Sequence, residues 1–281
     1  MLKQRIITAL VLLAILLPAV FYPSPQAFVA VALVLIAAGA WEWARLNQCS
    51  PAGAIVAGVS CAAMCLLSWY AGLLLLPLKP IWVLGGGLWV IMGAWLLNGG
   101  VKAWATVPRP LRLIGGVAGL WVAWLAVAQA RIMGINFLFS VLVLVWVADI
   151  SAYFAGRALG GRFFSRKLAP TISPGKTWEG ACGGLIGVVI CAVLWRGMDA
   201  SGPLEAASIY TRLANVHIAF MVLAVLFLAT MSIVGDLVES LFKRSAGVKD
   251  SSGLLPGHGG VLDRVDALLP TLPLAMMLAT L

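Results

Sequence analysis

Acidic side chains recur at regular spacing in the second half of an otherwise apolar sequence. Asp236 and Glu239 are three residues apart after the apolar stretch LAVLFLATMSIVG, and Asp263 and Asp266 are three apart further along the chain. Residues at this spacing share one face of a helix. Asp149 directly follows another apolar run, VLVLVWVA. The spacing therefore predicts several carboxylates at a common depth in a hydrophobic molecule.

Carboxylates that lie close together need positive charge between them. An ionised side chain inside a bilayer costs on the order of 2.5–3.5 kcal/mol on insertion scales, and like charges add to that cost. A divalent metal ion binds hard oxygen ligands and neutralises several carboxylates at once. The group of Asp149, Asp236, Asp263 and Asp266 therefore predicts a metal site. For any one of them, the alternative is a helix-end acid that reaches water or pairs with an arginine.

A basic loop in front of an apolar helix has the composition of a phosphate-binding segment. Residues 156–184, GRALGGRFFSRKLAPTISPGKTWEGACGG, carry five cationic side chains together with Ser173 and Thr177. Cations and the free N–H groups of a helix N-terminus suit phosphate oxygens. The GKT at 175–177 is not a Walker A motif, because position 170 is Pro where that motif requires Gly. The alternative is a basic loop that touches anionic lipid.

A second loop, KDSSGLLPGHGGVLDRVD at 249–266, gathers charge and glycine. Its glycines and Pro256 disfavour a regular helix and let the backbone approach a ligand closely. His258 is interpreted either as an ordinary loop histidine or as a ligand contact. Together, the two loops and the carboxylates predict metal-assisted handling of a phosphate ester at a membrane surface.

The composition identifies the elements that position these residues as membrane helices. The chain is 62% hydrophobic and 10% charged, with a mean hydropathy of +1.04, whereas soluble domains are about 45–50% apolar and about 25% charged. The prediction is an all-α polytopic integral membrane protein, whose net charge of +9 reflects basic loops and not nucleic-acid binding. A spanning helix needs about 20 apolar residues. About nine such spans are predicted, at 6–22, 26–46, 54–76, 81–98, 112–131, 136–156, 178–196, 215–240 and 261–281.

The basic residues predict the orientation of these spans. Fifteen of the nineteen Lys and Arg residues fall at one set of helix ends, which the positive-inside rule assigns to the cytoplasm. The N-terminus is then cytoplasmic, and the loops at 157–177 and 241–260 share the cytoplasmic side. We divide the chain into an N-terminal group of about four helices, 1–110, and a catalytic region of about five, 111–281.

Three other acids receive ordinary structural interpretations. Glu42, in the sequence WEWAR, is expected to pair with Arg45 near a cytoplasmic helix end. Asp199 and Glu205 fall in a predicted external loop, where we expect both to be solvated.

Three motifs resemble those of one enzyme family. The segment SLFKRSAGVKDSSGLLPGHGGVLDRVDAL, 240–268, is similar to the signature of the phosphatidate cytidylyltransferases, S-x-x-K-R-x4-K-D-x4-[apolar]-P-G-H-G-G-x-x-D-R-x-D. ADISAYFAGRALGG at 148–161 and SPGKTWEG at 173–180 resemble two further motifs of the family, with Gly175 in place of a usual Lys. The resemblance extends over roughly 145–270.

The resemblance implies the transfer of a cytidylyl group from CTP to phosphatidate, giving CDP-diacylglycerol and pyrophosphate. It implies Mg²⁺, with K⁺ beside it, and a homodimer in the cell inner membrane whose active site faces the cytoplasm. Asp236 and Asp263 would hold the metal, with Asp149 and Glu239 as further ligands. The residues expected to be catalytic are Asp236, Asp263, Asp266, Lys249 and His258. Those expected to bind substrate are Ser173, Lys176, Thr177, Lys243, Arg244, Arg264, Gly259 and Gly260.

Two other functions remain as alternatives. Acids within membrane helices also mark ion- or proton-coupled transporters, although a relay should distribute them through the depth of the bilayer. A related CTP-dependent enzyme could act on another lipid phosphate.

Overall fold

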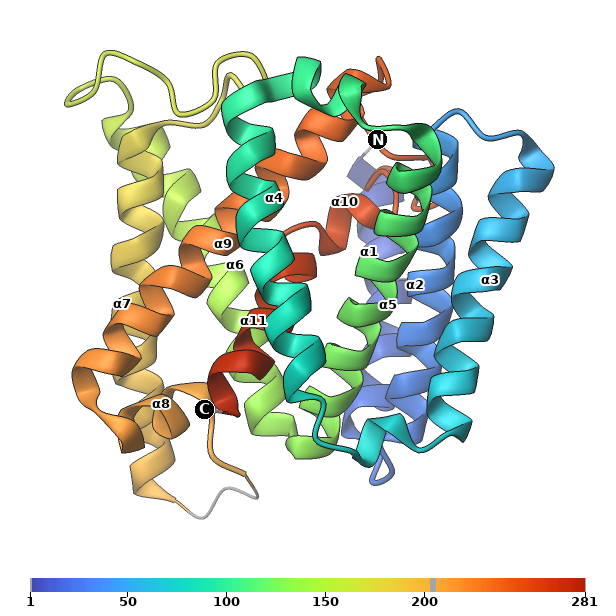
Figure 1. Ribbon diagram of the computed structural model, residues 1–281. Coiled ribbons are helices and arrows are strands. Elements are labelled where there is room, and N and C mark those ends of the chain that lie inside the picture. Colours follow the sequence, from blue (N-terminus) through green and yellow to red (C-terminus); the bar gives the residue numbers. More distant parts are fainter. Residues whose placement is uncertain (1, 203–205, 281) are drawn as a thin grey trace.

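The computed structural model describes residues 2–202 and 206–280, which form helices joined by loops (Figure 1). Within these residues, eight helices are long and apolar enough to cross a membrane. They run alternately up and down between the two ends of the molecule. The prediction of an all-α, multi-pass membrane protein is confirmed.

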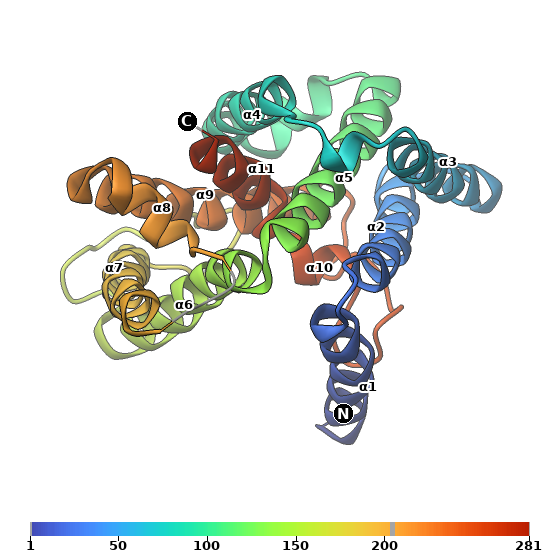
Figure 2. The same ribbon diagram turned by 90° about the horizontal axis from the view of Figure 1, so that it is seen from below.

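The first half of the chain forms four of these long helices and a short 3-10 turn: α1 (Leu2–Phe21), α2 (Gln26–Leu46), α3 (Pro51–Tyr70), η1 (Leu73–Leu75) and α4 (Lys79–Thr106). Helix α1 packs against α2 and projects away from the other helices (Figure 2). Helix α3 ends earlier than predicted, because Gly72 adopts a left-handed conformation with φ of 74°. Helix α4 is longer than predicted and is kinked at Gly100.

The second half adds the remaining long helices and three short ones: α5 (Arg109–Met133), α6 (Ile135–Leu159), α7 (Trp178–Ser201), α8 (Ile209–Val216), α9 (Ile218–Ser245), α10 (Leu262–Val265) and α11 (Leu268–Ala279). Helix α9 continues beyond the predicted end of its span at residue 240 and so includes Lys243 and Arg244.

The predicted ninth span, 261–281, is not one continuous helix. Helix α11 has twelve residues, which at about 1.5 Å per residue rise about 18 Å, less than a hydrocarbon core of about 30 Å. Pro270 has no N–H to donate to the carbonyl of Asp266, four residues earlier, so the helix is interrupted between α10 and α11. The interruption lies against α9 at Gly235, where an added Cβ would be 2.6 Å from the Asp266 carbonyl oxygen.

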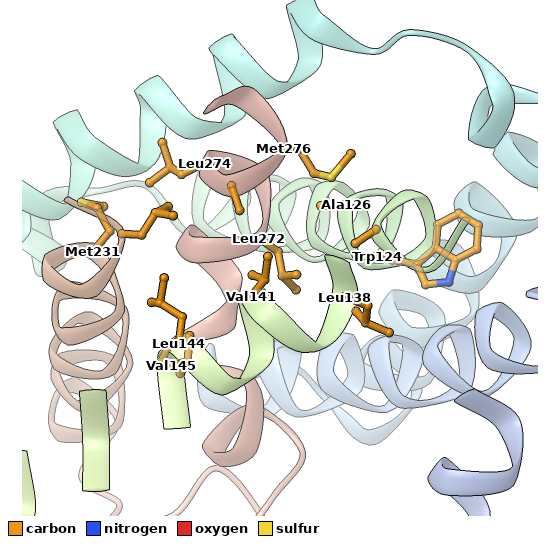
Figure 3. Packing of buried hydrophobic residues seen from close by; sticks show 14 of the residues in the cluster. Trp124, Ala126, Leu138, Val141, Leu144, Val145, Met231, Leu272, Leu274 and Met276 are labelled. Atoms are coloured by element: carbon orange, nitrogen blue, oxygen red, sulfur yellow. The ribbon is translucent and has the colours of Figure 1, made fainter. Parts of the chain in front are cut away.

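The C-terminal helix α11 nevertheless lies in the centre of the hydrophobic core. Leu272 and Leu274 of α11 pack near Val141 of α6 and Met231 of α9 (Figure 3). All four side chains are buried, and Leu274 is only 1% exposed. The packing of α11 in the core therefore also fixes α10, which precedes it, and with it the position of Asp263 and Asp266.

At the end of the molecule opposite the predicted cytoplasmic loops, Asp199 is held by hydrogen bonds. It accepts from Asn136 Nδ2 at 3.1 Å, from Ser208 Oγ at 2.5 Å and from Thr211 Oγ1 at 2.6 Å. The prediction of a solvated Asp199 is wrong, because α7 continues to Ser201 and α8 begins close to it. Glu205 lies outside the described residues.

The two loops predicted to be cytoplasmic lie at the same end of the molecule (Figure 1). Arg244 Nε, at the end of α9, donates to the Ile172 carbonyl in the first loop at 3.4 Å. Each loop also contains one isolated β-bridge, Ala169 with Ser173 and Leu255 with Gly259. The prediction that they share a face is confirmed.

Candidate active site

A polar cavity opens beside α9 at this end of the molecule. Its volume is about 380 Å³, and it lies between the end of α6, the start of α7 and the middle of α9. Asp149, Arg157, Lys176, Thr177 and Asp236 are among the residues that line it. The helices therefore bring together three predicted site residues from separate motifs, Asp149, Lys176 and Asp236.

Lys176 and Asp236 form an ion pair inside this cavity. Lys176 Nζ lies 2.5 Å from Asp236 Oδ2, and the two side chains are 25% and 29% exposed. Asp149 lies close enough to interact electrostatically with both. Ser240, one turn further along α9, donates to Asp236 at 3.4 Å. The positive charge predicted between the carboxylates is supplied in part by a lysine of the basic loop.

A second lysine, Lys243, joins two other acids in a less exposed cluster. Its ammonium contacts Glu239, four residues earlier on α9, and lies 2.6 Å from Asp263 Oδ1. The side chains of Lys243, Glu239 and Asp263 are 13%, 6% and 4% exposed. Spacings of three and four residues place Asp236, Glu239 and Lys243 along one side of α9, so this helix connects the cluster to the cavity.

Asp263 also organises the glycine-rich loop around itself. Its Oδ2 accepts from the Ser251 N–H at 2.9 Å, from Ser251 Oγ at 2.9 Å and from the Gly260 N–H at 2.7 Å. Burial opposes ionisation, but the hydrogen bonds from Lys243 and from these N–H groups outweigh it and lower the pKa of the Asp263 carboxyl. Gly259 has φ of +83°, and a Cβ there would lie 2.6 Å from Asp263 Oδ2.

Glu42 of α2 holds the same loop from the opposite side. It is fully buried and accepts from the N–H groups of Val261 and Leu262 at 2.9 and 2.8 Å. The hydroxyls of Ser251 and Ser252 donate to it at 3.2 and 2.5 Å. The expected pairing of Glu42 with Arg45 is wrong, because these four donors occupy the carboxylate.

Arg45 instead stacks over the Trp41 ring, 4.7 Å from its centre. Glu42 is thus a site residue that the sequence interpretation missed. The sequence signal for this role was an acidic residue near the end of an apolar helix. The hydrogen-bond partners of Glu42 lie 209 to 220 residues later in the chain, so no local pattern links them to it.

Asp266 lies at the interruption between α10 and α11. Its Oδ1 accepts from the N–H of Ala267 at 2.7 Å, and its charge interacts with those of Asp236 and Asp149. The interruption therefore places this third aspartate within electrostatic range of the polar cavity.

The basic loop is shaped by residues at the start of α7. Thr177 caps the helix, its Oγ1 accepting from the Gly180 N–H at 3.1 Å. Glu179 accepts from the N–H groups of Gly161, Phe163 and Phe164, each at 3.0 Å. Ser173 is half-buried in a turn of the same loop. Thr177 and Glu179 thus hold the loop that carries Lys176.

The other predicted residues are not among those that line the polar cavity. Arg244, Lys249 and Arg264 are exposed, while His258 is half-buried. Nδ1 of His258 is buried and has no hydrogen-bond partner within residues 2–202 and 206–280. Gly260 donates its N–H to Asp263, and a Cβ there would overlap Ser251 Oγ at 2.0 Å.

The donor set suits a hard cation. Within the described ranges, no three His, Cys, Asp or Glu side chains converge closely enough to hold a metal ion by themselves. Mg²⁺ is usually bound through one or two carboxylates together with substrate phosphates. Asp149 and Asp236 line the cavity together with Lys176 and Arg157, and the charge of Asp266 repels those of both aspartates. These residues therefore fit Mg²⁺ accompanied by a polyphosphate.

Comparison with known proteins gives one consistent family. The cytidylyltransferase family model matches residues 3–281. The phosphatidate cytidylyltransferase of Pseudomonas aeruginosa is 39% identical over 280 residues, covering 97% of this chain and 95% of the relative. The protein of the same name from Haemophilus influenzae is 36% identical and covers 97% and 96%. That from Bacillus subtilis is 41% identical over 150 residues, 53% of this chain and 49% of the relative. The chain belongs to the cytidylyltransferase family and is a nucleotidyltransferase.

Proposed function

We propose that this enzyme transfers a cytidylyl group from CTP to phosphatidate, giving CDP-diacylglycerol and pyrophosphate. The observation that supports this most strongly is the polar cavity at the end of the membrane helices, with Lys176, Asp236 and Asp149 on its walls. A water-soluble triphosphate and a membrane-bound phosphate can both reach such a position. The names of the two relatives that match the whole chain support the same substrates.

The lipid phosphate itself is the nucleophile in this reaction. A phosphate monoester is largely doubly ionised at neutral pH, since its second pKa is about 6. One of its oxygens forms a new bond to the α-phosphorus of CTP, while the bond from that phosphorus to the bridging oxygen breaks. The electron pair of the broken bond leaves with pyrophosphate. The enzyme therefore needs to position two polyanions and stabilise charge, without a nucleophile of its own.

Cationic side chains perform that task in the proposal. Lys176 and the N-terminus of α7 face the cavity and would bind phosphates of CTP. Lys243 would hold the lipid phosphate beside the buried acids. Arg244, Lys249 and Arg264 are exposed, and their positive charges would attract the triphosphate. His258, whose Nδ1 has no partner in the described part of the chain, would position pyrophosphate.

The carboxylates would hold Mg²⁺ when it is bound. Asp236 and Asp263 are the proposed ligands, completed by Asp149, Asp266 and Glu239. The ion would neutralise phosphate oxygens and increase the electrophilicity of the α-phosphorus. In the absence of substrate, Lys176 and Lys243 neutralise the same carboxylates. K⁺ beside Mg²⁺ and a homodimer stay predictions from the family resemblance.

We further propose that the protein lies in the cell inner membrane with this site facing the cytoplasm. The distribution of Lys and Arg supports this orientation. A cysteine placed at Ser252, in the second loop, should react with an impermeant thiol reagent only after the cell is opened. Labelling in intact cells would contradict the orientation.

The activity is tested with purified protein, phosphatidate, Mg²⁺ and CTP labelled either at the α- or at the γ-phosphate. The α-label should appear in a lipid product and the γ-label in pyrophosphate, in equal amounts. Chelation with EDTA should abolish both products, and added Mg²⁺ should restore them. Transfer of the α-label to another lipid phosphate, but not to phosphatidate, would favour a different CTP-dependent lipid enzyme. Failure to label any lipid would contradict the proposal.

A further inference from the structure

A second cavity, of about 390 Å³, lies on the other side of α9 from the polar one. It is lined by residues of α2, α4, α5 and α9 together with Leu262 of α10 and Leu269 of α11, and its walls include Met92 of α4 and Val122 of α5. Small-molecule pockets are typically about 300–1,000 Å³, so this space is large enough to hold part of a ligand. Its walls are predominantly apolar, so the cavity suits a hydrocarbon chain better than a polar, water-soluble ligand.

Helix α9 is the wall shared by the two cavities. Gly235, Val238 and Phe242 line the apolar cavity, at spacings of three and four residues. Ile233 and Asp236, on a different side of the same helix, line the polar cavity. A molecule with a charged head and an apolar tail could therefore place one part on each side of α9.

Among the described residues that line the apolar cavity, the charged ones are Glu239 and Arg112. Glu239 contacts Lys243, which is bound in turn to Asp263 at 2.6 Å. This chain of ion pairs connects the wall of the apolar cavity to the proposed catalytic residues. A headgroup phosphate beside Glu239 and Lys243 would thus be next to the site, with its tail in the cavity.

The end of the cavity nearest the loops is formed by aromatic rings and an arginine. Trp43, Trp104 and Phe242 pack together, with ring centres 4.4 to 5.8 Å apart. Arg112 lies over Trp104 at 4.8 Å and donates to the Val107 carbonyl at 2.7 Å. A positive charge at this end favours an anionic headgroup, while the other end extends between α4 and α5 to Gly85.

Two glycines on α5 show where the cavity has free space. A Cβ added at Gly115 or Gly119 would have no heavy atom of a neighbouring element within 4 Å. Both residues line the cavity and, four residues apart, share one face of α5. Gly87 on α4 has equally free surroundings but does not line the cavity. A side chain can therefore begin at either α5 position, and at the control position Gly87, without a clash at its Cβ.

We propose that this cavity holds an acyl chain of the diacyl lipid substrate and so orients its phosphate toward Lys243 and the polar cavity. The proposal rests on the proposed function and extends it to the apolar part of the substrate. Because lipid tails are as apolar as the cavity walls, transfer from the bilayer brings little hydrophobic gain. The cavity therefore acts mainly by orientation, which affects catalytic rate through the geometry of attack.

The proposal is tested with Gly119→Leu, which fills the cavity, and Gly87→Leu as control. Activities are measured with dioleoyl phosphatidate and with water-soluble dihexanoyl phosphatidate. We expect Gly119→Leu to lower kcat/KM for the dioleoyl lipid by about tenfold or more, while kcat/KM for the dihexanoyl lipid and KM for CTP stay near wild type. Gly87→Leu should leave all three unchanged.

The outcomes separate this proposal from the proposed function. If wild-type protein uses neither lipid, the proposed function fails. If it uses both and Gly119→Leu affects them equally, or affects neither, the acyl-chain site is overturned. A changed oligomeric mass of Gly119→Leu in detergent would assign the cavity to a contact between two copies and would also overturn it.

A binding measurement gives a second test that needs no turnover. Phosphatidate with a photoreactive diazirine in the distal half of one acyl chain is mixed with wild-type protein without CTP, irradiated and mapped by mass spectrometry. Labels should appear on Met92, Leu96 or Val122 and should decrease in Gly119→Leu but not in Gly87→Leu. Labels confined to exposed residues outside the cavity, such as Val83 or Leu84, would contradict the proposal.

Discussion

The two lysine clusters of the site differ in exposure and in the number of groups that hold them. Lys176 and Asp236 form one pair, about a quarter exposed, in the wall of the polar cavity. Lys243 is held between Glu239 and Asp263, and Asp263 also binds Ser251 and Gly260 of the loop. Exposed pairs contribute only about 0–1 kcal/mol, whereas breaking a buried pair costs about 3–5 kcal/mol.

This difference suggests a division of roles between the lysines. Lys176 can exchange Asp236 for a phosphate of the substrate at little cost in folding free energy. Lys243 cannot be removed from its acids without leaving buried charge, so in the proposed mechanism the second cluster would both contact substrate and maintain the loop. The contrast predicts that variants of the two clusters separate activity from stability.

The largest combined effect is expected for Asp263→Asn. It keeps the shape of the side chain but removes the charge that faces Lys243 and the loop N–H groups. We expect the free energy of unfolding to fall by about 3–5 kcal/mol and activity to fall by more than about a hundredfold. Thermal unfolding in detergent and the CTP assay measure the two quantities. If Asp263→Asn is active and as stable as wild type, the two lysine clusters do not differ in their contribution to stability.

A smaller effect on stability, with a large one on activity, is expected for Lys176→Met. Methionine keeps an unbranched side chain, one atom shorter than that of lysine, and loses the charge. Activity should fall by about a hundredfold or more, while the free energy of unfolding changes by less than about 1 kcal/mol. If Lys176→Met destabilises the protein as much as Asp263→Asn does, then the more exposed pair is structural and the proposed exchange with substrate is wrong.

The smallest effect on catalysis is expected for Glu42→Gln, because Glu42 holds the loop by hydrogen bonds and does not line the polar cavity. All four partners of Glu42 are donors, and the amide NH₂ would face some of them as a second donor. An unsatisfied buried group costs about 1–3 kcal/mol, so stability should fall by that amount with a partial loss of activity. Arg45→Met serves as the control and should change stability by about 1 kcal/mol or less. Equal losses of stability in both variants would instead support the pairing of Glu42 with Arg45.

The sequence predicted the parts of this molecule that depend on local pattern. Apolar runs of sufficient length predicted the eight long helices, and their alternation placed both loops at one end. The contact of Lys243 with Glu239 follows from a spacing of four residues on one helix. These features need no knowledge of how distant segments pack.

Features that depend on packing between distant segments were missed or only partly anticipated. The acids predicted a need for positive charge, but the pairing of Lys176 with Asp236 joins a loop to a different helix and has no local pattern. The interruption before α11 could have been inferred from Pro270, which removes a helical hydrogen bond. It was hidden by the apolar composition of 261–281, which resembles a complete span.

The role of Glu42 has a consequence for how the enzyme is made. This acid lies in α2, and its partners in the loop are translated 209 to 220 positions later. Until the loop is synthesised, the Glu42 carboxylate lacks its four hydrogen-bond donors. The ends of the long segment between α2 and the loop must also come together before these hydrogen bonds can form. The glycine-rich loop should therefore become ordered only after α9 has entered the bilayer, so that a chain inserted only up to that helix lacks the ordered loop.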